Sequence, residues 1–484
     1  MDKKEFSVLT RREFLRRAAC AAVGTTALTS AISDLRYMNA AVAQSSIGPN
    51  DYKALVCIFL QGGNDSNNMI IPTVQSEYNN YASIRTPVLA LPQSSILPVT
   101  SLDNDGHSYG FHPACPELQT LFGESKLAML FNVGTLIYPI TRSQYLSGTK
   151  NPPQLFSHAD QQTQWQTSIP DQLSQTGWGG RCADLLAAVQ PGAAISSLVT
   201  LGGANTFEIG NTTSQYSVST SGAVSLSNIS GARMQALTNL LGLPYPNLQA
   251  QAYAGTVEQA INNTSLLNNA ISATSSASYW TTPFPTKITS PTGGVAFSSS
   301  LAPQLKMVAR LIEAGHRSAL AGGFGMKRQI FFCQIGGYDL HTGQTPGPAA
   351  TTIGAHANLL AELSQSMYAF QRGMEQLQLS DSVTSFTASD FGRTFPSNGQ
   401  GSDHGWGSHH LILGGAVNGQ RTYGSFPVLT VNGPNDTSTG RWIPTTAIDQ
   451  YFATLATWFG VDASNLATVF PNLGRFSSPN LGFI

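Results

Sequence analysis

The sequence predicts an α/β fold built on a mostly parallel sheet, and two observations carry this prediction. Short, continuous apolar runs that end at glycine or polar residues recur along the chain. Such runs are typical of strands buried on both faces of a parallel sheet. Other segments repeat apolar residues every 3.6 positions, which indicates amphipathic helices. Strands that alternate with helices build an α/β domain.

Four apolar runs predict strands at 54–60, 127–133, 329–335 and 382–388. Each is followed by glycine or by small and acidic residues, such as Gly62-Gly63 after the first run and Ser389-Asp390 after the last. Ligands of open α/β sheets bind beyond the carboxyl ends of the strands. We therefore look for a site in the residues that follow these runs.

Two helices are predicted at 301–314 and 355–379, where apolar residues fall on one face and are explained by core packing. The middle of the chain, 201–300, differs because it is rich in Ser, Thr, Asn and Gly. It contains helix-like stretches at 234–241 and 252–267. We expect this segment to be an insertion or a cap on the main sheet.

The first 43 residues have the three parts of an export signal. A basic region containing Arg11-Arg12 and Phe14-Leu15 precedes a weakly apolar run at 18–32, and Ala41-Val42-Ala43 offers a cleavage site. Paired arginines followed by Phe-Leu are the address for the twin-arginine translocase. We expect residues 1–43 to be removed and residues 44–484 to be periplasmic or secreted.

Composition narrows the partners of the mature chain. Removal of residues 1–43 leaves 18 basic and 22 acidic residues, a net charge of −4. This balance provides no basic footprint for nucleic acid, and no later stretch is apolar enough for stable membrane insertion. The four remaining cysteines form no C-x-x-C pair, which argues against a zinc ribbon. The sequence neither requires nor excludes a disulfide between Cys115 and Cys182.

Two groups of candidate ligands follow predicted strands. Asp65 ends the stretch Gly62-Gly63-Asn64-Asp65, where a turn-forming role is the alternative. Asp339 and His341 follow Gly336-Gly337. Residues i and i+2 of an extended segment point the same way, so these two side chains can share one metal ion.

A third group begins at Asp390 and Arg393 and continues from Asp403-His404 to His409-His410. Carboxylates and imidazoles this dense in a glycine-rich segment suit a divalent cation such as zinc or manganese. Arg393 is a candidate for holding an anionic group. Solvated histidines of a surface loop are the alternative.

Ser157 is the candidate nucleophile. It lies in Ser157-His158-Ala159-Asp160, and a metal or base could activate its hydroxyl. A helix N-cap is the competing role for this serine. The sequence contains no Walker loop, H-E-x-x-H, G-x-S-x-G or dinucleotide fingerprint.

Together, these blocks resemble the family known as domain of unknown function 1501. The matching blocks, besides the twin-arginine signal, are F-L-x-G-G-N-D at 59–65, S-H-x-D-Q-Q-x-x-W-Q at 157–166, G-W-x-G-R at 177–181, R-Q-x-F-F…G-G-x-D-x-H at 328–341, and S-D-F-G-R…D-H-G at 389–405. The family is similar to a distant branch of the alkaline phosphatase and sulfatase superfamily. The resemblance implies a three-layer α/β/α sandwich with a divalent-metal site at the strand ends.

Residue by residue, the resemblance implies metal ligands at Asp65, Asp339, His341, Asp390 and His404, with Ser157 as nucleophile. Two departures stand out: Asp339 and His341 are two residues apart rather than four, and Phe391 stands where a histidine is expected. One or two ions (zinc, manganese or calcium) and an inactive site all stay open.

Two functions from different classes follow from these observations. The first is an exported metal-dependent hydrolase of phosphate or sulfate esters, in which Arg393 stabilises charge and the substrate is a small anionic ester or a glycan. The alternative is a non-catalytic exported protein that uses the same fold to bind a glycan or a partner protein.

Replacement of Arg11 and Arg12 by lysine is expected to leave the precursor in the cytoplasm, because the translocase recognises the arginine pair rather than charge alone. Fractionation of cells that express the double variant measures this. Export at the level of the parent protein would indicate the general secretory route instead.

Overall fold

The computed structural model describes residues 51–190, 193, 195–223, 229–276 and 278–484. The expected signal peptide at 1–43 lies outside these residues. Within the described part of the chain, no helix is both long and apolar enough to cross a membrane.

A ten-stranded sheet forms the centre of the molecule and confirms the predicted fold class. The strands follow the order β14 (Thr422–Gly424), β5 (Leu127–Gly134), β13 (Ser408–Gly414), β12 (Val383–Ser389), β1 (Lys53–Leu60), β11 (Arg328–Ile335), β6 (Leu198–Thr200), β7 (Tyr216–Ser219) and β8 (Gly222–Ala223), and β15 (Thr446–Ala447) also pairs with β5. β1 is parallel to both β11 and β12. β13 is antiparallel to both of its neighbours, β12 and β5. The four predicted strands correspond to β1, β5, β11 and β12.

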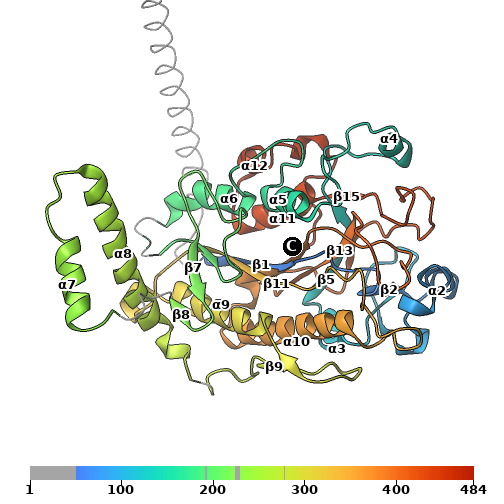
Figure 1. The fold of residues 1–484 in the computed structure, drawn as a ribbon, viewed down its shortest axis with the longest axis horizontal. Helices are drawn as coiled ribbons and strands as arrows, with labels where there is room; N and C mark the ends of the chain where they lie inside the picture. Colours follow the sequence, from blue (N-terminus) through green and yellow to red (C-terminus); the bar gives the residue numbers. More distant parts are fainter. Residues whose placement is uncertain (1–50, 191–192, 194, 224–228, 277) are drawn as a thin grey trace, which may run out of the picture.

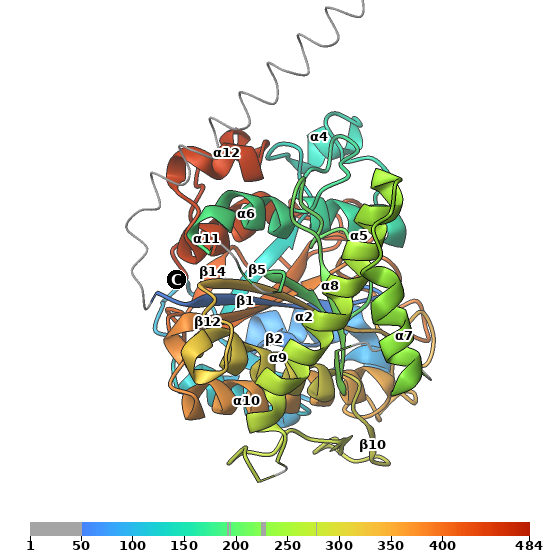
Figure 2. The same ribbon diagram turned by 90° about the vertical axis from the view of Figure 1, so that its left-hand side faces the viewer.

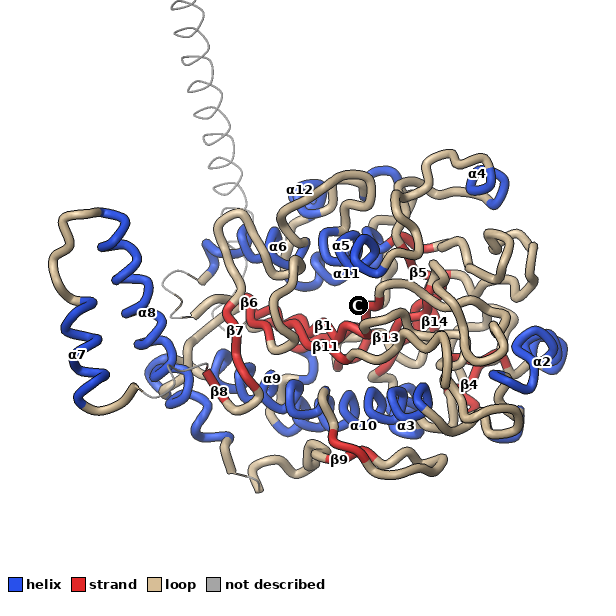
Figure 3. Tube along the Cα trace, in the orientation of Figure 1, coloured by secondary structure: helices blue, strands red, loops and turns tan. Residues whose placement is uncertain are grey.

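Side chains of β1 alternate between two separate cores, as the two-residue period of a strand requires. Val56 and Ile58 belong to one buried cluster, while Leu55 and Phe59 belong to the other. A strand buried on both faces needs a helical layer on each side. The result is a three-layer α/β/α sandwich, with helices above and below the sheet (Figure 1). Figure 3 shows the same layering by secondary structure.

The helices divide between the two faces of the sheet. One layer contains α3 (Pro116–Gly123), α9 (Leu301–His316) and α10 (Ala355–Gln376), and the other contains α5 (His158–Thr167), α6 (Trp178–Leu186), α11 (Ile448–Phe459) and α12 (Leu466–Val469). The helices α9 and α10 lie where the apolar period predicts them. Two more helices, α2 (Gln75–Leu89) and α4 (Arg142–Leu146), lie outside these layers.

The segment 201–300 partly extends the sheet and partly projects from it. Its strand β7 pairs with β6, whereas α7 (Ala232–Leu241) and α8 (Leu248–Ala270) form a helical pair beyond that edge of the sheet (Figures 1 and 2). The hairpin of β9 (Lys287–Ile288) and β10 (Phe297–Ser298) follows. A second small sheet contains β2 (Ile70–Pro72), β4 (Tyr109–Phe111) and β3 (Leu97–Val99).

The histidine pair His409-His410 is part of the core, which corrects its expected place in a ligand-rich loop. Both residues lie in β13 and are about 1% exposed. Burial lowers the pKa of each imidazole to about 3. His409 Nδ1 accepts a hydrogen bond from the backbone N–H of Asn132 at 3.1 Å. These rings are therefore neutral packing residues.

The four cysteines among the described residues are free and buried. Cys115 belongs to the core on the α9 and α10 side, and Cys182 belongs to the core on the α6 and α11 side. The sheet separates them, so the structure excludes the disulfide that the sequence left open.

Replacement of Asp449 by asparagine is expected to stabilise the protein increasingly as pH rises. Burial in the first turn of α11 raises the pKa of Asp449 to about 8, so the folded chain retains a proton that the unfolded chain releases above about pH 4. The parent protein consequently loses up to about 1.4 kcal/mol of stability for each pH unit in this range. Urea unfolding of both proteins at pH 5 and pH 7 measures the difference. An equal difference at both pH values would contradict this assignment.

Candidate metal centre

Five chain segments meet at one edge of the sheet because of the strand directions. β1, β11 and β12 are parallel, so their carboxyl ends lie together. β13 is antiparallel to β12, so it begins where β12 ends and brings residues 403–404 to the same edge. The first turn of α5 lies over this edge and contributes His158. Polar residues that are distant in the sequence therefore lie close together at this edge of the sheet.

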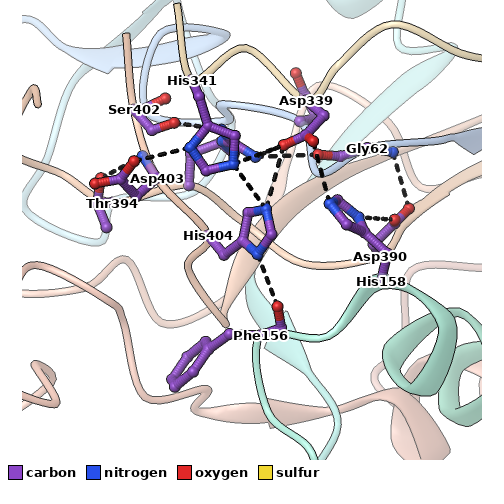
Figure 4. A network of polar contacts seen from close by, with 12 residues as sticks. Gly62, Phe156, His158, Asp339, His341, Asp390, Thr394, Ser402, Asp403 and His404 are labelled. Carbon is purple, nitrogen blue, oxygen red and sulfur yellow. Dashed lines mark hydrogen bonds and ion pairs between the residues drawn. The ribbon is translucent and has the colours of Figure 1, made fainter.

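Three imidazoles surround the carboxylate of Asp339 (Figure 4). Nε2 of His341 lies 3.1 Å from Asp339 Oδ1, and Nε2 of His404 lies 3.2 Å from the same oxygen. Nε2 of His158 lies 3.4 Å from Asp339 Oδ2. We call these four residues the Asp339 cluster. The carboxylate at its centre is 45% exposed, so the cluster is open to a ligand.

Each ring of the Asp339 cluster is oriented by an acceptor at its other nitrogen. Nδ1 of His158 lies 2.6 Å from Asp390 Oδ2, and Nδ1 of His341 lies 2.8 Å from Asp403 Oδ1. Nδ1 of His404 lies 2.7 Å from the carbonyl oxygen of Phe156. A carbonyl or ionised carboxylate only accepts, so each Nδ1 carries the hydrogen. The three Nε2 lone pairs are left facing Asp339.

This arrangement fits a bound divalent cation. Nε2 of His158 is buried without a hydrogen-bond partner among the described residues. Nε2 of His341 and Nε2 of His404 are 2.9 Å apart, an unfavourable contact for two lone pairs unless a proton or a cation is shared. Ligand atoms of His158, Asp339 and His404 all lie within 4.8 Å of one another. Histidines that donate Nδ1–H to carboxylates and carbonyls are typical metal ligands.

Arg393 holds Asp339 in its charged form. Its side chain is fully buried and donates from Nη1 to Asp339 Oδ1 at 2.7 Å. Burial acts to raise the pKa of Asp339, but the hydrogen bond and charge of Arg393 outweigh it and lower that pKa. Nη1 also donates to the backbone carbonyl oxygen of Gly62, and Nη2 donates to the backbone carbonyl oxygen of Ser402. The observed contacts make Arg393 a positioning residue, rather than the open anion-binding group that the sequence suggested.

Asp390 stands behind His158 rather than inside the Asp339 cluster. Its Oδ2 accepts from His158 and from Gln162 Nε2 at 2.9 Å, and its Oδ1 accepts from the backbone N–H of Gly62 at 3.1 Å. The hydrogen bond that His158 donates to Asp390 raises the pKa of His158, while burial lowers the pKa of His404. A proton and a bound metal ion would compete for these nitrogens, so the affinity for a metal would fall in acid.

Asp65 lies in a separate buried network. Arg85 and Gln344 both donate to its Oδ2, and the Asp65–Arg85 ion pair is almost completely inaccessible. The charge of Arg85 therefore balances Asp65 without a metal ion. Gln344 in turn accepts from Ser402 at 2.7 Å, which links this network to the backbone that Arg393 contacts.

Ser157 lies between Phe156, whose carbonyl oxygen contacts His404, and His158, which is part of the Asp339 cluster. It occupies the N-cap position of α5, but its hydroxyl makes no capping bond. The hydroxyl instead donates to Asp160 Oδ2 at 2.5 Å. Upstream in the chain, Thr141 caps α4 and is exposed.

The structure thus brings Asp339, His341 and His404 together directly, and it places Asp390 and Arg393 one contact behind them. Sequence analysis included Asp403 in the third group of candidate ligands without giving it a role of its own, and it did not assign His158. His158 is adjacent to the named candidate Ser157, and this adjacency was the available signal. Arg441 was also missed: its Nε donates to the His404 carbonyl at 2.7 Å, and its guanidinium lies over the Phe156 ring.

Residues 52–467 match the family described as Protein of unknown function (DUF1501). The chain belongs to this family. No curated protein matches the sequence. Two solved structures of Ps i-CgsB, one in complex with k-i-k-neocarrahexaose, are similar to this DUF1501 protein at 10% identity and a TM-score of 0.34. Each alignment covers 88% of this chain and 77% of the other. Likeness at this level says nothing about the chemistry of the site.

Replacement of Asp403 by alanine in this DUF1501 protein is expected to weaken zinc affinity by roughly 10- to 100-fold, because His341 loses the acceptor that orients its ring. Competition with a chromogenic chelator measures the affinity, and circular dichroism checks the fold. Asp381→Ala, at an exposed position just before β12 and therefore at the end of that strand opposite the cluster, is the matched control. Equal affinity in the Asp403 and Asp381 variants would remove His341 from the ligand set.

Proposed function

We propose that this DUF1501 protein is an exported, metal-dependent hydrolase of phosphate or sulfate esters, and a distant relative of the alkaline phosphatases and sulfatases. The observation that carries the proposal is the convergence of three imidazole Nε2 atoms on the carboxylate of Asp339 at the carboxyl edge of the sheet. Open edges of this kind are where α/β enzymes bind their ligands. The twin-arginine signal supports action outside the cytoplasm.

The donor set favours zinc or manganese over calcium. Calcium takes six to eight oxygen ligands, whereas imidazole nitrogens with one carboxylate suit zinc and similar transition metals. Asp339, His158 and His404 would hold the ion, and His341, whose Nε2 lies 3.1 Å from Asp339 Oδ1, would be a further ligand. A bound divalent cation would polarise the ester oxygen and neutralise charge that develops in the transition state.

Ser157 is the proposed nucleophile, because its neighbours on both sides contact the Asp339 cluster. A serine hydroxyl needs a base to take its proton. Asp160 already accepts the hydrogen bond of Ser157. In the proposed first step, Ser157 Oγ bonds to phosphorus or sulfur, its proton moves to Asp160 Oδ2, and the leaving oxygen departs with the bonding electron pair and takes a proton from water. In the second step, the resulting hydroxide attacks the phosphorus or sulfur of the seryl ester, the bond to Ser157 Oγ breaks, and the proton returns from Asp160 to Ser157.

Arg441 is the proposed contact for the ester anion in place of Arg393. All terminal nitrogens of Arg393 are engaged within the protein. Arg441 is anchored through Nε to the carbonyl of His404, and its two terminal nitrogens have no hydrogen-bond partner among the described residues. A guanidinium with two parallel donors matches the oxygens of a phosphate or sulfate group.

Ser157→Ala is expected to abolish turnover of 4-nitrophenyl phosphate or 4-nitrophenyl sulfate while leaving the metal content unchanged. His404→Ala is expected to lose both turnover and metal, because it removes a ligand. Release of 4-nitrophenol and elemental analysis of the same samples measure the two effects. Ser83→Ala, an exposed serine of α2, is the control and keeps full activity.

Two results would contradict the proposal in different ways. Full activity of Ser157→Ala would exclude that serine as nucleophile and direct attention to Thr141 or Ser143. Absence of turnover with zinc, manganese and both esters in the parent protein would exclude the hydrolase and favour a binding protein.

A further inference from the structure

A polar cleft of about 580 Å³ lies directly beside the Asp339 cluster. Its volume is within the range of small-molecule sites. It is lined by side chains of β1, α5, β11 and the segment after β6, and none of the described residues that line it carries a charge. Its most frequent polar groups are carboxamides, those of Gln61, Gln162, Gln166, Asn205, Gln215 and Gln334.

The cleft and the cluster share a wall. Gln162 donates to the same Asp390 oxygen that holds His158. Gln61 precedes Gly62, whose N–H donates to Asp390 and whose carbonyl oxygen accepts from Arg393. A molecule whose ester group lies at Asp339 would therefore extend its remaining part into the cleft.

Five of the carboxamides are anchored at one end and unpaired at the other. Gln166 Oε1 accepts from the backbone N–H of Thr206 at 2.7 Å, and Gln215 Oε1 accepts from Asn205 Nδ2 at 3.1 Å. Both keep an unpaired NH₂ group among the described residues. Because a backbone N–H only donates, the amide orientation at Gln166 is chemically determined.

Among the described residues, the amides of Gln162, Gln334 and Gln61 are also bonded at one end only, and together they leave both acceptors and a donor group unpaired. Gln162 Nε2 donates to a carboxylate, which leaves its Oε1 as a free acceptor. Gln334 Nε2 donates to Gln61 Oε1 at 2.6 Å, which leaves one acceptor and one NH₂ group. The cleft thus presents fixed donors and acceptors with no net charge.

We propose that this cleft binds the carbohydrate part of the substrate, so that the ester hydrolysed at the Asp339 cluster is a sugar sulfate or sugar phosphate. This inference rests on the proposed function for its reaction, but not for its binding step. Each sugar hydroxyl is both a donor and an acceptor, which matches a mixed amide array. The hydrocarbon chain of a lipid would leave these amides without partners, and a nucleotide would lack an aromatic platform for its base.

The first experiment measures binding alone. Calorimetric titration of the zinc-loaded protein with neutral cello-, manno-, galacto- and chito-oligosaccharides is expected to identify a ligand. Gln166→Met/Gln215→Met is expected to raise its Kd about tenfold, through loss of two amide contacts. Ala204→Trp, which fills the cleft from an exposed position without removing any of these amide bonds, is expected to do the same. Gln365→Met, on α10 across the sheet, is the matched control with unchanged Kd.

The second experiment measures hydrolysis of 4-nitrophenyl sulfate, 4-nitrophenyl phosphate and 6-O-sulfated or 6-phosphorylated hexoses. Ala204→Trp is expected to lower kcat/KM about tenfold on the sugar esters and less than twofold on the aryl esters. Oligosaccharide binding that is sensitive to the cleft variants, without any hydrolysis, would support the cleft and contradict the hydrolase. Hydrolysis without oligosaccharide binding, and with equal effects of Ala204→Trp on both ester classes, would overturn the carbohydrate proposal.

Discussion

The parallel pairing of β1 with β11 and β12 is the constraint on which the candidate site depends. Leu60, the last residue of β1, is in register with Ile335 at the end of β11 and with Ser389 at the end of β12. The three strands therefore finish at the same level. The segments that follow them emerge side by side, and the side chains of Asp339 and Asp390 approach the backbone of Gly62.

The close approach at this edge leaves no room for a side chain at Gly62. Its backbone has a φ of +113°, a conformation that residues with a Cβ rarely adopt. A Cβ atom there would lie 2.5 Å from the backbone nitrogen of Asp339. The glycine thus allows the turn after β1 to pack against the turn after β11. Movement of the turn after β11 would shift Asp339 away from Asp390. These two carboxylates contact the two ring nitrogens of His158.

Charge at the site is arranged in layers. Arg393 is buried and would be costly without a partner, and Asp339 supplies that partner. Asp390, Asp403 and the Phe156 carbonyl each orient one imidazole from behind. In front of them, the three Nε2 atoms surround the carboxylate of Asp339. The neighbouring cleft contributes uncharged amides, so a charged reaction centre adjoins a surface suited to a neutral ligand.

The sequence by itself predicted four central strands, the helices α9 and α10, and several residues that meet at the candidate site. Apolar runs marked β1, β5, β11 and β12, since a strand buried on both faces must be apolar along its length. The rule that ligands bind beyond strand ends selected Asp339, His341 and His404. Residue spacing could not determine which side chains face the opening, because that depends on contacts between distant segments. Asp65 pairs with the buried Arg85 and does not belong to the cluster. His409 and His410 lie in the buried strand β13. Because β13 is antiparallel to β12, His404, which precedes it, lies at the edge where β12 ends. His158 joined the site through a helix that begins far from any apolar run, so only the tertiary structure decided its place.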